Sequence, residues 1–337
     1  MLYWVQIYKI LTNNKHITTF FRTFALNIRG MSLKENVLAT LKSEDTEGPF
    51  ELYVTRTPGY LWALFFKALH IHPIAVTLIS IVIGAASGYF FYFDDVRMNL
   101  IGIGLLVWAN WYDCADGQLA RMTGKRTLVG RLLDGLAGDI WFYCIYQAIV
   151  LRLQPQMGIW IWLLCAYAGF ICHGRQAALA DYYKNIHLWF AFGDSKSELD
   201  TYAQENGRYQ QLRWRRGEWF EKLYLFFYRS YTKGQEDQTP RFQSFYRALR
   251  QTYPNGNIPT PLRQQFRAKS LPLMPLTNIL TFDLRVGVLF LSLLVGYPII
   301  FPIFEIAVLE PVRFYTRHRH EAFCHEFQST LPAYEER

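Results

Sequence analysis

The sequence has few charged residues and few cysteines for its length. Charged residues make up 18% of the 337 residues and hydrophobic residues 51%, whereas a soluble domain has about 25% charged residues. This balance excludes a chain that is disordered throughout. The cysteines form no CxxC pair and are odd in number, which argues against a disulfide scaffold and a zinc site. We therefore expect reduced thiols at Cys114, Cys144, Cys165, Cys172 and Cys324.

Internal repeats, low-complexity tracts and a secretory signal are also missing from the sequence. Residues 1–30 are basic and moderately apolar, without a clean apolar core or a small-residue cleavage site, so we expect no signal peptide. Met31 opens a more ordinary segment, which leaves open whether residues 1–30 are an upstream extension.

Long apolar runs are abundant, and they predict an all-α integral membrane protein. The mean hydropathy of +0.03 indicates that these runs alternate with a sizeable polar part. The net charge is +8, and the basic residues lie mostly beside and between the apolar runs, as on a cytoplasmic membrane face. Residues 50–70 are amphipathic and aromatic, which is typical of an interfacial helix. The first four spans are expected at 73–93, from 99 to 111 and onward into polar residues, at 130–151 and at 157–179.

The apolar region 275–315 allows two arrangements. It can form a hairpin of two spans that turns at Gly296, Tyr297 and Pro298, or a single span of about 24 residues from Val286. The N-terminus, the basic loop 121–131, the basic stretch 181–274 and the basic C-terminal tail should all face the cytoplasm. An even number of spans satisfies this condition, so we predict a bundle of six transmembrane helices.

Four segments follow from this pattern. Residues 1–70 form a cytoplasmic and interfacial segment, 71–180 the first four spans with the catalytic residues, 181–274 a basic cytoplasmic insert, and 275–337 the last two spans and a cytoplasmic tail. The insert contains two amphipathic stretches, 217–231 and 240–253, that predict helices. It lacks any nucleic-acid-binding motif, so we expect no nucleic-acid partner.

A dense group of carboxylates, glycines and basic residues lies between two apolar runs, at 113–139. On a helix, Asp113 and Asp116 fall within an arc of roughly 100° that also contains Gly117 and Ala120. If the second and third helices are neighbours, Asp134 converges on the same place. Three carboxylates at membrane depth cannot all stay ionised without a compensating cation. The oxygen ligands predict Mg²⁺ or Mn²⁺, as one or two ions.

The alternative for these carboxylates is a solvated loop in which they pair with Arg121, Arg126 and Arg131. Ion pairs of that kind at a surface contribute little and need no ligand. The spacing of the residues favours the metal site over the loop.

The string D-x2-D-G-x2-A-R-x8-G-x3-D resembles the signature of the CDP-alcohol phosphatidyltransferase family. A weaker likeness lies upstream, at Arg56, Pro58 and Gly59 and at Pro73-x2-Val76-Thr77, where Ile74 replaces an asparagine common in the family. The predicted six-span core also fits the family's architecture. The signature residues are Asp113, Asp116, Gly117, Ala120, Arg121, Gly130 and Asp134.

The resemblance implies a phosphotransferase of phospholipid synthesis that uses a CDP-alcohol. An acceptor hydroxyl would attack the β-phosphorus of this substrate, and CMP would leave. Asp113, Asp116 and Asp134 would hold Mg²⁺ or Mn²⁺, and the nucleotide site would be lined by Gly117, Ala120, Arg121 and Gly130. The site would open to the cytoplasm from the cell (inner) membrane, and a homodimer is a candidate assembly.

The sequence departs from the family pattern at the fourth carboxylate, which would bind metal and act as the general base. The family has an aspartate at the position of Gly138, whereas here the aspartate is Asp139. On a regular helix Asp139 points about 140° away from Asp134. We expect a π-bulge within 134–140 to bring Asp139 back onto the face of Asp134, because such bulges occur at functional sites.

Two pairs of substrates fit the sequence, and a different class of function is a further alternative. A basic group of Arg126, Arg131 and Arg175 favours CDP-diacylglycerol with a phosphorylated polar acceptor such as inositol phosphate. The alternative is CDP-ethanolamine or CDP-choline with a lipid alcohol such as diacylglycerol or a ceramide. A membrane ion transporter would also use intramembrane carboxylates, but here they gather at one end of two helices.

Overall fold

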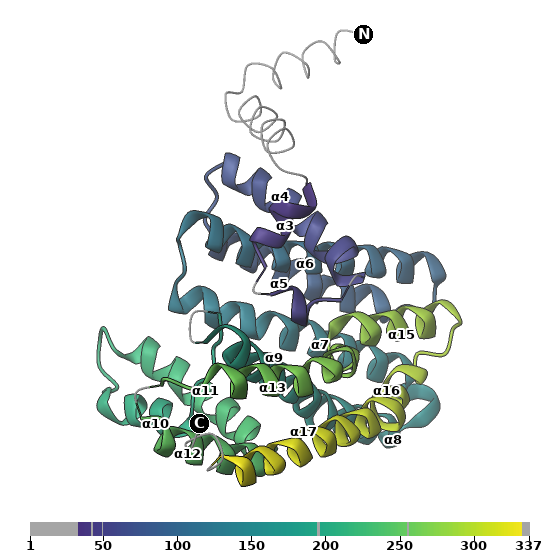
Figure 1. Ribbon diagram of the computed structural model, residues 1–337. Coiled ribbons are helices and arrows are strands. Elements are labelled where there is room, and N and C mark those ends of the chain that lie inside the picture. Colours follow the sequence, from purple (N-terminus) through teal and green to yellow (C-terminus); the bar gives the residue numbers. More distant parts are fainter. Residues whose placement is uncertain (1–32, 42, 49, 194–195, 255, 332–337) are drawn as a thin grey trace. The chain divides into compact units, whose positions relative to one another are not determined.

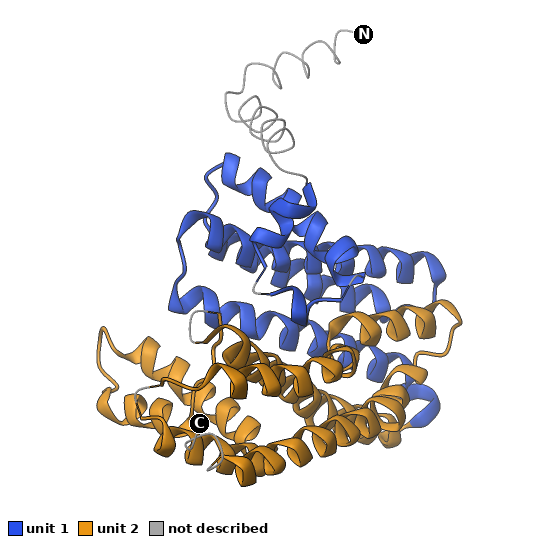
Figure 2. Ribbon diagram, in the orientation of Figure 1, with its two compact units in different colours: residues 1–157 blue, residues 158–337 orange. Residues whose placement is uncertain are grey.

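The computed structural model describes residues 33–331 apart from 42, 49, 194, 195 and 255. The expectations for residues 1–30 therefore lie outside the described part. The chain divides into two compact units, Met1–Met157 and Gly158–Arg337, shown in different colours in Figure 2. The described residues form helices and connecting turns without a strand, which confirms the all-α prediction. The five cysteines are free thiols, as expected.

The first unit contains three long helices preceded by shorter ones (Figure 1). Pro73 stands at the first position of α5, and the Nδ1 atom of His72 accepts a hydrogen bond from the Ile74 amide. Asp95 caps α6 by accepting from the amides of Arg97 and Met98. The elements are α3 (Leu33–Ala39), the 3-10 turn η1 (Glu44–Thr46), the π-helical η2 (Glu51–Arg56), α4 (Thr57–Ala68), α5 (Pro73–Phe91), α6 (Val96–Thr123) and α7 (Leu128–Met157).

Helix α5 packs against both α6 and α7. The approach of α7 is close because a Cβ atom at Gly84 would lie 2.3 Å from the Trp141 ring. Helix α4 approaches α6 in the same way at Gly59, where a Cβ atom would lie 2.7 Å from Cys114 Cβ. Small residues thus let the helices that carry the acidic motif pack tightly on their neighbours.

The second unit begins with a continuous helical stretch and continues into a group of amphipathic helices. Both helices predicted in the basic insert are present, as α11 and α12. The elements are α8 (Ile159–Ala166), the π-helical η3 (Tyr167–His173), α9 (Gly174–Phe192), α10 (Tyr202–Gln211), α11 (Trp219–Asp237), α12 (Pro240–Thr252), α13 (Thr260–Ser270), η5 (Leu271–Leu273), α14 (Met274–Ile279), α15 (Phe282–Leu294), α16 (Ile300–Phe304), the π-helical η6 (Glu305–Leu309) and α17 (Glu310–Thr330).

An aromatic core holds the helices of the second unit together. The ring centroids of Phe190 and Phe266 are 3.6 Å apart in a stacked arrangement, and Phe245 stacks on both rings. These three side chains are fully or almost fully buried and come from α9, α13 and α12. The core therefore joins α12 and α13 to α9, the helix in which the insert begins.

A buried ionic cluster lies in the same unit. The Arg285 Nε atom is 3.2 Å from Glu305 Oε1, and His173 Nδ1 is 3.5 Å from the same oxygen. Gln176 accepts from the Arg285 guanidinium and donates to the Glu305 carbonyl. Glu305 and His173 belong to the π-helical segments η6 and η3. The cluster thus balances its charges within the chain.

The helical region near the C-terminus is interrupted between Leu294 and Ile300. Gly296 adopts φ of 78°, a left-handed conformation that ends α15. The break falls at the Gly296-Tyr297-Pro298 turn and excludes one uninterrupted helix from Val286. It fits the hairpin arrangement.

Three helical stretches in the described residues are long and apolar enough to cross a membrane. They are Pro73–Phe91, Leu128–Met157 and Thr260–Leu294. Helix α6 is 28 residues long but contains Asp113, Asp116 and Arg121 in its second half. The protein is therefore a membrane protein, and the count of six spans remains a prediction.

Candidate active site

A short connection between α6 and α7 brings the acidic motif together. Helix α6 ends at Thr123, and its C-cap residue Gly124 adopts φ of 67°. The Thr127 hydroxyl accepts a hydrogen bond from the Gly130 amide over 3.0 Å and so caps α7. Asp116 precedes the end of α6 by seven residues and Asp134 follows Thr127 by seven. At about 1.5 Å per residue, the two carboxylates stand at a similar distance from the connection.

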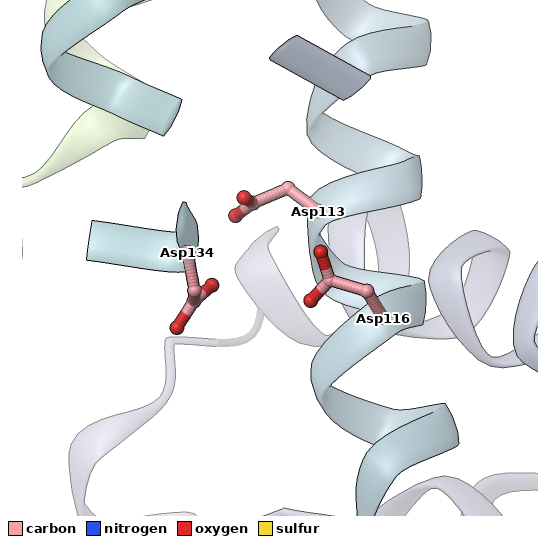
Figure 3. A group of neighbouring side chains, drawn as sticks. All are labelled: Asp113, Asp116 and Asp134. Atoms are coloured by element: carbon pink, nitrogen blue, oxygen red, sulfur yellow. The ribbon is translucent and has the colours of Figure 1, made fainter. Parts of the chain in front are cut away.

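The side chains of Asp113, Asp116 and Asp134 converge. Each offers a carboxylate oxygen, and these atoms all lie within 4.8 Å of one another. Figure 3 shows Asp113 and Asp116 on the same helix, with the Asp134 carboxylate reaching toward them from a different element. This confirms that the three carboxylates predicted from the spacing come together.

We call Asp113, Asp116 and Asp134 the triad. The solvent exposure of these side chains increases from Asp116 to Asp134. Asp116 is only 4% exposed, Asp113 is intermediate and Asp134 is exposed. The Asp116 Oδ2 atom is buried without a hydrogen-bond partner. Because Asp116 is buried within α6, it is not part of a solvated loop. An unpartnered buried carboxylate oxygen beside two other carboxylates fits a cation ligand.

The segment before α4 places a further arginine at the same end of α6. The Arg56 guanidinium donates to Glu47 and Glu51 over 2.9 to 3.2 Å and contacts the Cys114 sulfur at 3.8 Å. Gln118 of α6 donates to the Arg56 carbonyl. Arg56 thereby lies near Asp113. The sequence indicated this residue only through the weak likeness at 56–59, and Glu47 and Glu51 gave no signal.

The residues expected around the nucleotide lie on the same two helices. Gly117, Ala120 and Arg121 belong to α6, and Gly130 belongs to the first turn of α7. A Cβ atom at Gly117 would meet the Arg121 guanidinium at 3.4 Å. The Arg121 Nε atom is buried without a hydrogen-bond partner. An unpartnered guanidinium donor next to a glycine can hold an anionic group.

The expected π-bulge near Asp139 is absent, because α7 is α-helical from Leu128 to Met157. Asp139 therefore points about 140° away from Asp134 around the helix axis. The group of converging carboxylates comprises Asp113, Asp116 and Asp134 without Asp139. The bulge prediction was wrong, and the role of Asp139 as metal ligand and base stays a prediction without support from the backbone.

Two other charged residues, Asp181 and Arg175, have different surroundings. Asp181 accepts hydrogen bonds from Asn185, Tyr231 and Gln235 over 3.1 to 3.2 Å, so it links α9 to α11. Arg175 is exposed on α9. It belongs to the second unit, whereas Arg126 and Arg131 belong to the first.

The comparisons with known proteins agree with the acidic motif. The sequence model of the CDP-alcohol phosphatidyltransferase family matches residues 70–190, which include the whole motif. No curated protein and no solved structure matches the chain. Residues 70–190 are thus similar to the CDP-alcohol phosphatidyltransferase family, a family of transferases of substituted phosphate groups.

Proposed function

We propose that Asp113, Asp116 and Asp134 hold divalent cations, Mg²⁺ or Mn²⁺, against the diphosphate of a CDP-alcohol. The convergence of the three carboxylates within 4.8 Å, with one buried Asp116 oxygen left unpartnered, carries this proposal. Oxygen ligands of this kind suit hard divalent cations. Three carboxylates can share two ions, which is the number we propose. Asp139 is left out of this set because α7 is straight.

The reaction transfers a substituted phosphoryl group. The acceptor hydroxyl oxygen forms a bond to the β-phosphorus of the CDP-alcohol, the bond between that phosphorus and the bridging oxygen breaks, and CMP leaves with the bonding electrons. Bound divalent cations would supply Lewis-acid stabilisation of the diphosphate charge. The chain itself would orient the substrate, with Gly117, Ala120 and Gly130 giving the nucleotide access to the helix backbones and Arg121 donating to a phosphate oxygen.

Arg56 is proposed to support the same end of the site. Its guanidinium is fixed by Glu47 and Glu51 and lies near both Asp113 and Arg121. A fixed cation beside the triad offsets part of the negative charge before substrate binds. The proton of the acceptor hydroxyl must pass to a group within hydrogen-bond reach of the attacking oxygen. The family has an aspartate for this role at the position of Gly138, and Asp139 lies one residue after it.

We propose CDP-diacylglycerol and a phosphorylated polar acceptor, such as inositol phosphate, as substrates. Arg126 and Arg131 support this choice because both are exposed, Arg126 just before α7 and Arg131 in its first turn, close to Asp134 in the chain. Guanidinium groups bind phosphate with two parallel hydrogen bonds. The second arrangement, in which CDP-ethanolamine or CDP-choline donates to a lipid alcohol, needs no such basic group at the acceptor.

The substrates can be identified by incubating the purified protein with each CDP-alcohol, each acceptor and Mg²⁺, followed by measurement of CMP and mass spectrometry of the lipid product. CMP release with CDP-diacylglycerol and a phosphorylated acceptor is the expected result. Release only with CDP-ethanolamine or CDP-choline would select the second arrangement. Ion flux without CMP release from any CDP-alcohol would indicate the transporter.

We also propose six spans in the cell (inner) membrane, with the triad and the insert facing the cytoplasm. The basic loop 121–131 and the basic insert support this orientation. Cysteines introduced at the exposed positions Arg97 and Arg247 can be tested in intact cells with a thiol reagent that does not cross membranes. Labelling at 97 but not at 247 is expected, and labelling at 247 would overturn the topology.

A further inference from the structure

Helix α11 of the insert presents large aromatic side chains to the outside. Trp219 is 51%, Phe226 42% and Phe227 54% exposed, and Trp214 in the preceding turn is 59% exposed. Phe226 and Phe227 follow Trp219 by seven and eight residues, so the three lie within about 100° around the helix. We call these four residues the aromatic face of α11.

The opposite side of α11 is packed in the ordinary way. Tyr224 is 3%, Leu225 0% and Thr232 1% exposed. Gln235 on this side donates to the Ala178 carbonyl of α9. The aromatic face is therefore not the side by which α11 joins its own unit. A helix at the surface of a water-soluble domain normally has a polar outer side.

Basic side chains border the aromatic face. Between residues 213 and 233 the sequence has six Lys or Arg residues and two Glu residues. The Lys222 and Arg229 side chains lie over the Tyr209 ring of α10, at 4.5 Å and 3.7 Å from its centroid. They also reach the edge of the aromatic face, at 5.8 Å from the Trp214 centroid and 5.6 Å from the Phe226 centroid. Aromatic rings flanked by Lys and Arg are the composition of helices that lie in the plane of an anionic membrane surface.

The place of α11 in the chain keeps it near a membrane. The end of the insert runs into Thr260–Leu294, a stretch apolar enough to span a bilayer. A tethered helix meets the membrane surface at a high effective concentration, so even a modest affinity is sufficient for binding.

We propose that α11 is an interfacial anchor, whose aromatic face inserts into the headgroup region of an anionic bilayer while the flanking Lys and Arg residues contact lipid phosphates. The partner is thus a lipid surface, and this role is separate from the chemistry at the aspartate triad. The anchor would hold the basic insert against the membrane that also contains the lipid substrates.

The test uses the full chain in lipid nanodiscs with a bimane fluorophore on a cysteine introduced at Phe227. Cys144→Ala removes the partly exposed native cysteine, since the other four are buried. The matched control carries the label at Arg247, an exposed position on α12. Brominated phosphatidylglycerol in the nanodisc should quench the label at 227 at least about twofold and leave the label at 247 nearly unchanged.

Charge-reversal variants test whether the aromatic face of α11 binds specifically to anionic lipid. Arg216→Glu with Lys233→Glu should reduce quenching at 227, whereas Arg247→Glu with Lys269→Glu should not; all four residues are exposed. Exchange of phosphatidylglycerol for phosphatidylcholine should reduce the quenching as well.

Equal quenching at 227 and 247, or none at 227, would overturn the anchor. Energy transfer between labels at 227 on two copies, without quenching by lipid, would show that a second copy covers the aromatic face instead. CMP release from a CDP-alcohol, measured on the same samples, reports separately on the triad, so failure of the anchor and failure of the proposed reaction are distinguishable.

Discussion

The two units each bury charged side chains, but they compensate the charges differently. In the second unit Glu305 is fully buried, and it lies 3.2 Å from Arg285 and 3.5 Å from His173. In the first unit the triad brings three carboxylates within 4.8 Å of one another. The triad thus brings like charges together, whereas Glu305 faces an arginine.

The comparison separates a structural role from a binding role. A buried ion pair that is balanced within the chain stabilises one packing arrangement and needs no ligand. A group of like charges destabilises the folded chain until a cation arrives from solution. We therefore expect substitutions in the triad to abolish turnover with little loss of stability, and substitutions in the ionic cluster of the second unit to do the reverse.

The largest effect is expected at the triad. Asp113→Asn, Asp116→Asn and Asp134→Asn should each lower turnover by about 10³-fold or more, because each removes a charged ligand from the cation site. The thermal midpoint measured in EDTA should stay the same or rise, since one repelling charge is lost. Retention of more than about a tenth of wild-type CMP release by all three variants would remove the distinction between the units.

Glu305→Gln should act on stability. The change leaves Arg285 buried without its carboxylate partner, which costs about 3–5 kcal/mol of unfolding free energy. Thermal unfolding in detergent measures this loss. The matched control is Glu326→Gln, which removes the exposed partner of Lys269 and should cost less than about 1 kcal/mol. Equal midpoints for the two variants would show that the cluster does not stabilise the unit.

A pH effect on stability is expected from His320 in α17. Burial lowers the pKa of this imidazole to about 3, below about 6.5 in an unfolded chain. The unfolded state therefore binds the proton more readily, so stability is fully present above pH 6.5 and is lost as the pH falls toward 3. At pH 5 the loss should be about 2 kcal/mol.

Chemical unfolding at pH 7.5 and pH 5 tests this expectation on the wild type and on His320→Phe. Phenylalanine keeps the stacking on Tyr183, where the ring centroids are 3.9 Å apart, but does not titrate. The variant should lose less stability on acidification than the wild type. His318→Gln, at an exposed position, is the control and should behave as the wild type does. An identical pH dependence in all three proteins would contradict the assignment.

The smallest effect is expected at Asp139. Because α7 is straight and turns this carboxylate away from Asp134, Asp139→Asn should lower turnover by less than about tenfold. Steady-state CMP release compares it with Asp134→Asn on the same helix. A loss at Asp139 as large as at Asp134 would mean that α7 deforms when substrate binds and that the family pattern was the better guide.

The triad could be predicted from the sequence because it depends on local geometry. Helical spacing fixes Asp113 relative to Asp116, and a short connection between two helices brings Asp134 to the same end. The prediction of a π-bulge was wrong, although it also rested on helical spacing. The displaced aspartate suggested a π-bulge, but α-helical hydrogen bonding continues through Gly135 and Gly138.

The remaining contacts join residues that are distant in the chain. Arg56 reaches Cys114, and Arg285 lies between His173 and Glu305, across separations that no periodic pattern reports. The π-helical segments η2, η3 and η6 were also unforeseen, because a single extra residue in a turn leaves the hydrophobic pattern almost unchanged. Prediction from sequence therefore found the charges that gather locally and missed those that pair over long distances.

The requirement for a divalent cation tests the central claim most directly. CMP release by the purified protein, with CDP-diacylglycerol and a phosphorylated acceptor, should stop in excess EDTA and return on addition of Mg²⁺ or Mn²⁺. Asp116→Asn should not recover at the same cation concentration. Full CMP release by the wild type in excess EDTA would contradict a metal role for Asp113, Asp116 and Asp134.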